Sequence, residues 1–75
     1  MPRLPRISSR KLISLLVRAG FYVHHQTGSH INLRHDSKTH LHIVVPANRK
    51  ELAPKTLKSI IVQAEMNIED FMFLL

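Results

Sequence analysis

The sequence predicts an α+β fold: a helix, a three-stranded antiparallel sheet, a second helix and a short C-terminal helix. Three observations lead to this prediction. Two segments repeat apolar residues at helical spacing, three segments between them alternate apolar and polar residues, and short polar turns join the alternating segments, which favours antiparallel pairing. Because each helix has one apolar stripe and the sheet has one apolar face, we expect a two-layer α-β-β-β-α sandwich with both helices on the same face.

The first helix is predicted to follow an extended arm, residues 1–7. Ser8 and Ser9 are good candidates for its N-cap, and Gly20 follows its last turn, where glycine is favoured. Its apolar stripe is formed by Leu12, Leu15, Leu16 and Ala19. Lys11 and Arg18 lie on the opposite, polar side of the helix.

Three strands are predicted over residues 21–26, 30–35 and 40–45, with a tight turn at 27–29 and a polar loop at 36–39. Their alternation gives the sheet one apolar face, which we expect to contact the helices. That face carries Phe21, Val23, Ile31, Leu33, Leu41, Ile43 and Val45.

The second helix is predicted to start at Pro54, because proline suits the first helical turn. Its apolar stripe consists of Leu57, Ile60, Ile61 and Ala64. Asn67 then has the character of a new N-cap, and the carboxylate of Asp70 three residues later favours the start of a short helix that ends near Leu75.

The opposite face of the predicted sheet is open to water and carries no carboxylate. By alternation it holds Tyr22, His24, Gln26, His30, Asn32, Arg34, His40 and His42. Hydrogen-bonding, cationic and aromatic groups of this kind suit phosphates, ribose hydroxyls and the faces of bases. The alternative is an ordinary polar sheet face, on which a mixture of charges would be expected.

The charge balance also favours a polyanionic partner. Eleven Lys and Arg residues face five Asp and Glu residues, which gives 75 residues a formal net charge of +6. Such an excess on a small body attracts nucleic acid, anionic lipid or an acidic protein. We expect a single domain over residues 1–75. The chain has no cysteine, no membrane-length apolar run and no signal-peptide pattern, so a cytoplasmic protein that does not bind membranes is expected.

His30 is the residue best placed for chemistry. Gly28 allows a tight turn or a close approach to a phosphate, and Ser29 adds a hydroxyl just before the strand that His30 begins. An imidazole gains and loses a proton near neutrality, so it suits general acid–base catalysis. In RNA the 2′-hydroxyl is an internal nucleophile, and a histidine among cationic side chains could promote its attack without a metal.

The chain resembles the HicA family of mRNA interferase toxins from about Ser9 to Leu75. The residues that carry the resemblance are Ala19-Gly20-Phe21, Gln26 with Gly28-Ser29-His30, Val44-Val45-Pro46, Glu51-Leu52, Thr56-Leu57 and Phe71. It departs from the family pattern at three positions: His25, commonly Arg; Asn48, commonly His; and Glu65, commonly Gly. An inactive or altered member is therefore an alternative.

The resemblance implies a fold similar to the double-stranded RNA-binding domain and a toxin that blocks translation by cleaving mRNA without a metal or other cofactor. It implies a HicB-like antitoxin as partner and maps the catalytic histidine onto His30. The other residues expected to bind RNA or stabilise the phosphate are Gly28, Ser29, Lys11, Arg18, Tyr22, His24, Gln26, Asn32, Arg34, His40, His42, Arg49 and Lys50. Among these, His24, His40, His42 and Lys50 are candidates for the second acid–base role.

Two other interpretations stay open. His40 and His42 with His24 or His30 could bind zinc, although no carboxylate is predicted nearby to orient such ligands. The chain could also be a binding module for RNA or DNA without catalysis, which would use the basic helix residues Lys11, Arg18, Lys55 and Lys58.

Overall fold

The computed structural model describes residues 4–75, and the order of its elements is the predicted one. The elements are α1 (Ser9–Arg18), β1 (Phe21–Thr27), β2 (His30–His35), β3 (His42–Pro46), α2 (Pro54–Gln63) and α3 (Ile68–Phe73). Residues 4–8 form neither helix nor strand, while residues 1–3 of the expected arm lie outside the described part. The predicted α-β-β-β-α arrangement is therefore confirmed.

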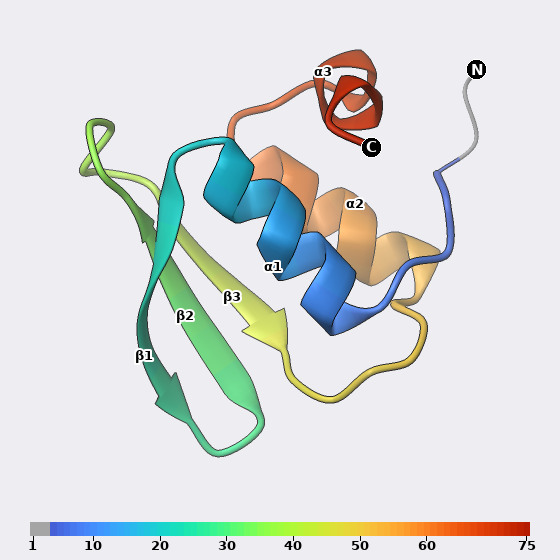
Figure 1. The fold of residues 1–75 in the computed structure, drawn as a ribbon, viewed down its shortest axis with the longest axis horizontal. Helices are drawn as coiled ribbons and strands as arrows, with labels where there is room; N and C mark the ends of the chain where they lie inside the picture. The colour runs from blue at the N-terminus through green and yellow to red at the C-terminus, as the bar shows by residue number, and fades with distance from the viewer. Residues whose placement is uncertain (1–3) are drawn as a thin grey trace.

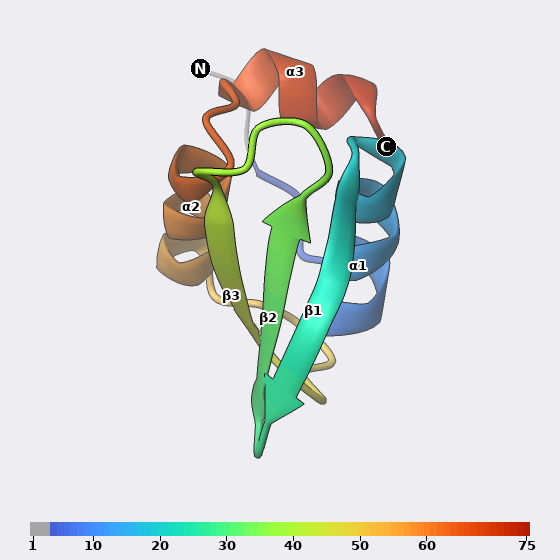
Figure 2. The ribbon, with the colours of Figure 1, turned by 90° about the vertical axis from the view of Figure 1, so that its left-hand side faces the viewer.

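The sheet has the order β1-β2-β3, and both neighbouring pairs are antiparallel. The helices lie on one side of it, with α1 against β1 and β3 and α2 against β3 (Figure 1). Figure 2 shows the other face of the sheet turned to the viewer, uncovered by any element of residues 4–75. In the same residues no helix has the length and apolar character needed to cross a membrane.

Side chains define the predicted helix starts. The Ser8 hydroxyl accepts a hydrogen bond from the Lys11 N–H at 3.0 Å, and the Asn67 side chain accepts one from the Asp70 N–H at 2.7 Å. Such caps satisfy N–H groups that have no partner inside the helix. After α1 the chain turns through Gly20, whose φ of 101° is available to glycine at little cost.

The core lies between the sheet and the helices. The fully buried residues among its largest side chains are Phe71, Leu12, Leu15, Leu16, Leu33, Ile43, Leu57, Ile60 and Val45. Burying one such side chain contributes about 1.5 to 3 kcal/mol. The prediction that Val23 contacts the helices is only partly met, because Val23 is 49% exposed. Val23 lies on the edge strand β1, which has a neighbouring strand on one side only, so its side chain stays half open although its partner Leu33 is buried. The tip of the β1–β2 hairpin extends beyond the helical layer (Figure 1).

The third strand begins later than predicted. Residues 39 and 40 form a turn, in which the Leu41 N–H donates to the Lys38 carbonyl at 3.0 Å, and β3 runs from His42 to Pro46 instead of 40–45. His40 is therefore not a strand residue. Periodicity could not detect the later start of the strand, because apolar and polar residues already alternate from His40 through the turn into β3.

Candidate functional site

The strand register places the open-face residues in rows. Arg34 lies between Tyr22 of β1 and His42 of β3, and Asn32 lies opposite Val44. His30 forms the last row, with Thr27 on one side and Pro46 on the other. Because directly paired residues share a face, these side chains lie on the face that the helices leave open.

A β-bulge at His24 changes which residues of β1 share that face. Val23 pairs with Leu33, but His25 pairs with Asn32 and Gln26 with Ile31. The extra residue reverses the alternation after it, so His25 is on the open face and Gln26 is on the helix face. The expectation that Gln26 belongs to the open face is wrong, and His25 takes a place there that simple alternation did not give it.

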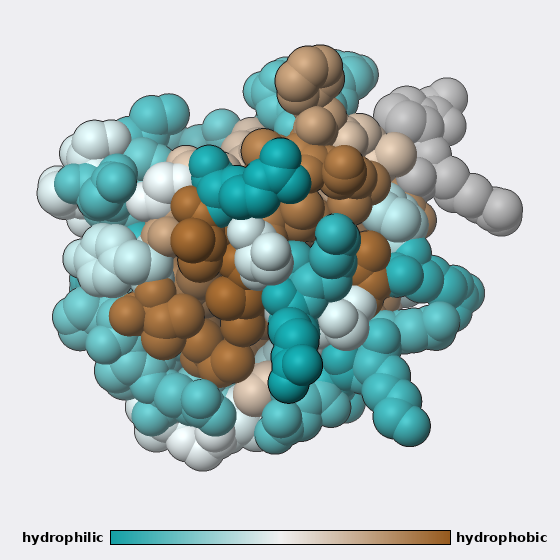
Figure 3. Space-filling view, viewed as in Figure 1, coloured by the Kyte–Doolittle hydropathy of each residue, from teal (hydrophilic) through white to brown (hydrophobic). Residues whose placement is uncertain are grey.

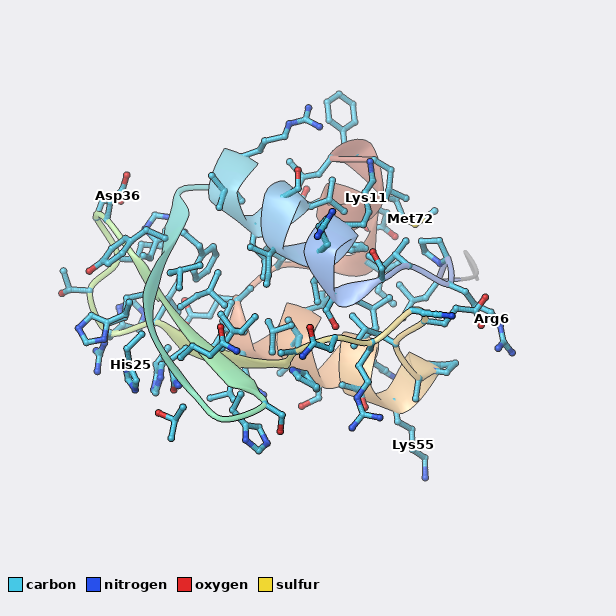
Figure 4. The ribbon with its side chains drawn as sticks, turned by 60° about the horizontal axis from the view of Figure 1, so that its bottom comes forward. Arg6, Lys11, His25, Asp36, Lys55 and Met72 are labelled. Atoms are coloured by element: carbon cyan, nitrogen blue, oxygen red, sulfur yellow. The ribbon has the colours of Figure 1, made fainter. Side chains whose placement is uncertain are left out.

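Three other predicted site residues lie away from this face. The Arg18 guanidinium donates from Nη1 to the Leu74 carbonyl at 2.9 Å and so holds α3 to the end of α1. Lys11 is exposed on α1, in the layer behind the sheet (Figure 4). His40 lies in the β2–β3 turn, where its Nε2 is 3.2 Å from Oε2 of Glu65, so a carboxylate does reach one of the predicted histidines.

Hydrogen bonds distinguish His30 from the other histidines. The bonds that involve the other five rings join His24 to His25, His42 to Asn32, His40 to Glu65, and His35 to Ala19 and to the N–H groups of residues 37 and 38. The His30 ring is exposed and has no hydrogen-bond partner within residues 4–75. Both of its ring nitrogens are therefore available to a ligand.

The turn before His30 is firmly held. Gly28 has a φ of 57°, and Ser29 has no positive φ, which is the pattern of a type II′ hairpin turn. The Gln26 side-chain amide donates to the Gly28 carbonyl at 3.0 Å, and the Ala47 N–H donates to the Ser29 carbonyl at 2.7 Å. These bonds tie the start of β2 to the loop that follows β3, so His30 stands on a rigid backbone next to that loop.

A groove of about 580 Å³ opens on the helix side of this hairpin. Its lining comes from the start of α1, the hairpin and the β3–α2 loop: Ser8, Ser9, Arg10, Ile13, Gln26, Ile31, Ala47, Asn48, Arg49 and Lys50. Figure 3 shows apolar atoms gathered between β1 and α1 with polar atoms around them. The groove thus combines an apolar part, which includes half-buried Ile13 and Ile31, with a basic rim.

Buried Ser9 joins two walls of the groove. Its hydroxyl donates to the Pro46 carbonyl at 2.6 Å and accepts from the Arg49 N–H at 3.1 Å. Its own N–H donates to the Arg49 carbonyl at 3.0 Å. Sequence reasoning placed Ser9 only as a cap candidate; its long-range partners have no local signal.

The groove is positively charged. Within residues 4–75 the carboxylates in close contact with basic groups are Glu51 with Arg6, and Asp36 and Glu65 with the rings of His35 and His40. None of these contacts includes Arg10, Arg49 or Lys50, so nothing in the described chain neutralises these three cations. The sequence analysis did not name Arg10 as a site residue and noted Asn48 only as a departure from the family pattern. In the same residues no three His, Asp or Glu side chains gather in a way that could hold a metal ion. The alternative zinc cluster is not formed there: His30 is four residues along β2 from the partner of His42, and His24 is bonded to His25.

Comparison with known protein families identifies a match over most of the chain. The family model described as "HicA toxin of bacterial toxin-antitoxin" matches residues 9–66. No curated protein matches the chain, and neither does any solved structure. The matched segment runs from the start of α1 to beyond α2 and contains the hairpin, His30 and every residue of the groove lining except Ser8.

Proposed function

The chain belongs to the HicA toxin family of bacterial toxin–antitoxin systems, and from this premise we propose that it is a metal-independent endoribonuclease that cleaves single-stranded mRNA and thereby blocks translation. His30 is the catalytic residue of this proposal. The observation that carries it is that His30 alone among the six histidines has a ring without a hydrogen-bond partner in residues 4–75. A solvent-exposed imidazole without a hydrogen-bond partner is free to exchange a proton with a substrate.

The reaction uses the nucleophile that RNA itself contains. His30 accepts the proton of the 2′-hydroxyl as the 2′-oxygen attacks the adjacent phosphorus. The bond from phosphorus to the 5′-oxygen then breaks, which leaves a 2′,3′-cyclic phosphate and a 5′-hydroxyl end. A cation or a donor beside the phosphorane stabilises its developing charge.

The basic groove supplies the binding component of the proposal. Pro46 lies opposite His30 in the sheet, and the loop with Arg49 and Lys50 follows it directly. The Ser29 hydroxyl and the Gly28 backbone lie in the turn on the other side of His30. An RNA strand that crosses the hairpin end therefore meets cations and hydrogen-bonding groups near the point of cleavage, as backbone recognition requires.

The proposed protein partner is a HicB-like antitoxin, and the proposed site of action is the cytoplasm, where mRNA is found. A net charge of +6 favours rapid association with an acidic partner as well as with RNA. An antitoxin that covers the hairpin end would exclude RNA.

The test compares purified wild type with His30→Ala on single-stranded RNA, with Gln63→Ala on α2 as the control. We expect His30→Ala to lower the cleavage rate by about 100-fold or more while the affinity for RNA changes little. We also expect growth arrest on expression of the wild type and not of His30→Ala. If His30→Ala cleaves RNA as fast as the wild type, or if the wild type binds RNA without cleaving it, the proposal is wrong; the second result would favour a binding module.

A further inference from the structure

The β-bulge brings a second histidine next to His30. His25 pairs with Asn32, which is two residues beyond His30 on the same strand and the same face. His25 is therefore a diagonal neighbour of His30, at a spacing of about 7 to 8 Å in an antiparallel pair. Figure 4 shows His25 on the side of β1 that faces away from α1. Without the bulge, His25 would lie on the opposite face of the sheet.

The ring of His25 is held by its neighbour. The Nδ1 atoms of His24 and His25 are 2.8 Å apart, and the two rings meet nearly at right angles with centroids separated by 5.0 Å. One of these nitrogens must carry the hydrogen and the other must be bare. The hydrogen bond uses Nδ1 of His25 and leaves its Nε2 with no partner in residues 4–75.

The other histidines lie too far from His30 to share a phosphate with it. His42 pairs with Arg34, four residues along β2 from His30, which is about 13 Å along the strand. His40 is in the turn at that same distant end, beside Glu65. His35 is occupied by backbone groups on both ring nitrogens.

We propose that His25 is the general acid of the cleavage reaction and that His24 positions it. The inference rests on the proposed function, because it names the second proton-transfer group of the same site. An imidazole pair separated by a diagonal strand spacing can contact a phosphate from two sides, since each hydrogen bond adds about 2.8 Å to the width of the phosphate itself.

The proton balance of the step is complete. Protonated His25 donates its Nδ1 hydrogen to the bare Nδ1 of His24 and its Nε2 hydrogen to the departing 5′-oxygen. As the phosphorus–oxygen bond breaks, the Nε2 proton passes to that oxygen and gives the 5′-hydroxyl, while His30 has taken the 2′-hydroxyl proton. His25 is left neutral with its Nδ1 hydrogen bond intact, so the ring keeps its orientation.

The experiment uses two substrates that differ at one atom. The first is a single-stranded oligoribonucleotide, and the second has sulfur in place of the 5′-oxygen at the cleaved linkage. A thiolate leaves without being protonated, because a thiol is a far stronger acid than an alcohol. We expect His25→Ala to cleave the oxygen substrate about 100-fold more slowly than the wild type and the sulfur substrate within about 3-fold of it. His30→Ala, which lacks the base, should be slow on both substrates.

Matched measurements make the result decisive. Thr39→Ala in the distant β2–β3 turn is the control variant, and it should cleave both substrates at the wild-type rate. His25→Asn keeps a polar group beside His24 and guards against a loss of folding, which circular dichroism checks for every variant. Binding of an oligonucleotide with a 2′-deoxy residue at the cleaved linkage reports affinity without cleavage.

Two results would overturn the assignment of His25. One is equal loss of rate on the oxygen and sulfur substrates for both His25→Ala and His25→Asn, since a binding or structural role would slow both reactions. The other is wild-type rates of both variants on the oxygen substrate. Failure of the proposed function is a separate outcome, in which the wild type itself cleaves neither substrate.

Discussion

Gly20 and His35 approach each other so closely that no other residue fits at position 20. A Cβ atom on Gly20 would lie 2.6 Å from Nε2 of His35. That nitrogen is 3.0 Å from the Ala19 carbonyl, and Nδ1 of the same ring accepts the Lys38 N–H at 2.9 Å. Because Nδ1 accepts, Nε2 must carry the hydrogen and donate it to Ala19. His35 therefore joins the end of α1 to the β2–β3 turn.

We expect Gly20→Ala to destabilise the fold by about 3 kcal/mol, because a φ of 101° strains any residue with a Cβ and the new methyl group would displace His35. Gly28→Ala is the matched control. Its φ is also positive, but a Cβ there meets nothing within 4 Å, so a cost of about 1 kcal/mol is expected. Urea unfolding followed by circular dichroism measures the free energy of unfolding of both variants. An equal decrease for the two would show that the contact with His35 does not contribute to the cost of Gly20→Ala.

Glu65→Gly should stabilise the protein by about 0.5 to 1 kcal/mol. Glu65 follows α2 with a φ of 55°, the left-handed conformation that glycine adopts most easily at the end of a helix. The change also removes the contact with His40, which is largely exposed and therefore worth little. Glu65→Ala removes the same contact without relieving the strain, so a melting temperature above wild type for Ala as well would contradict this explanation.

Ser9→Ala should cost about 2 kcal/mol, since the part-buried Pro46 carbonyl and Arg49 N–H would both lose the Ser9 hydroxyl as a partner. Ser8→Ala removes only the helix cap, for which about 1 kcal/mol is expected. The two adjacent serines also differ in a second measurement. Faster amide hydrogen exchange at Arg49 in Ser9→Ala, and not in Ser8→Ala, would show that Ser9 anchors the loop; unchanged exchange would refute this.

Replacing both Arg49 and Lys50 by Gln should weaken RNA binding for every sequence tested. The logarithm of the RNA-binding constant falls linearly with the logarithm of the salt concentration. For single-stranded RNA, the loss of two phosphate contacts should make that slope shallower by about 1.4. The double variant Lys55→Gln and Lys58→Gln carries the same charge change on α2 and should keep the wild-type slope. Fluorescence anisotropy at several salt concentrations measures the RNA affinity of both double variants. A larger effect of the α2 variant would show that RNA binds at α2 and not at the groove.

RNA cleavage should continue unchanged in excess EDTA. The proposed chemistry uses imidazoles and cationic side chains only, and no cluster in residues 4–75 could hold a metal ion. Rates measured with and without EDTA, after prior dialysis against the chelator, check this. Loss of cleavage that added Zn²⁺ restores would replace the acid–base mechanism with a metal-dependent one.

The candidate site was only partly predictable from the sequence. Alternation correctly put Asn32 and Arg34 on the open face, since β2 is regular and its neighbour Leu33 is buried. Alternation put Gln26 on the wrong face, because the extra residue in the β1 bulge exchanges the two faces for every residue of the strand that follows it. A bulge depends on how two strands pair, and the side chains of β1 alone carry no signal for it.

The sequence by itself determined the order of the elements, their caps and the apolar faces that join them. These features depend on residues within a few positions of each other, so periodicity and capping rules detect them. Only the tertiary structure decided that His25 neighbours His30, that Ser9 holds the loop of Arg49, and that a basic groove forms between three separate segments. Each of these contacts joins residues through strand register or loop closure, and neither is encoded in local spacing.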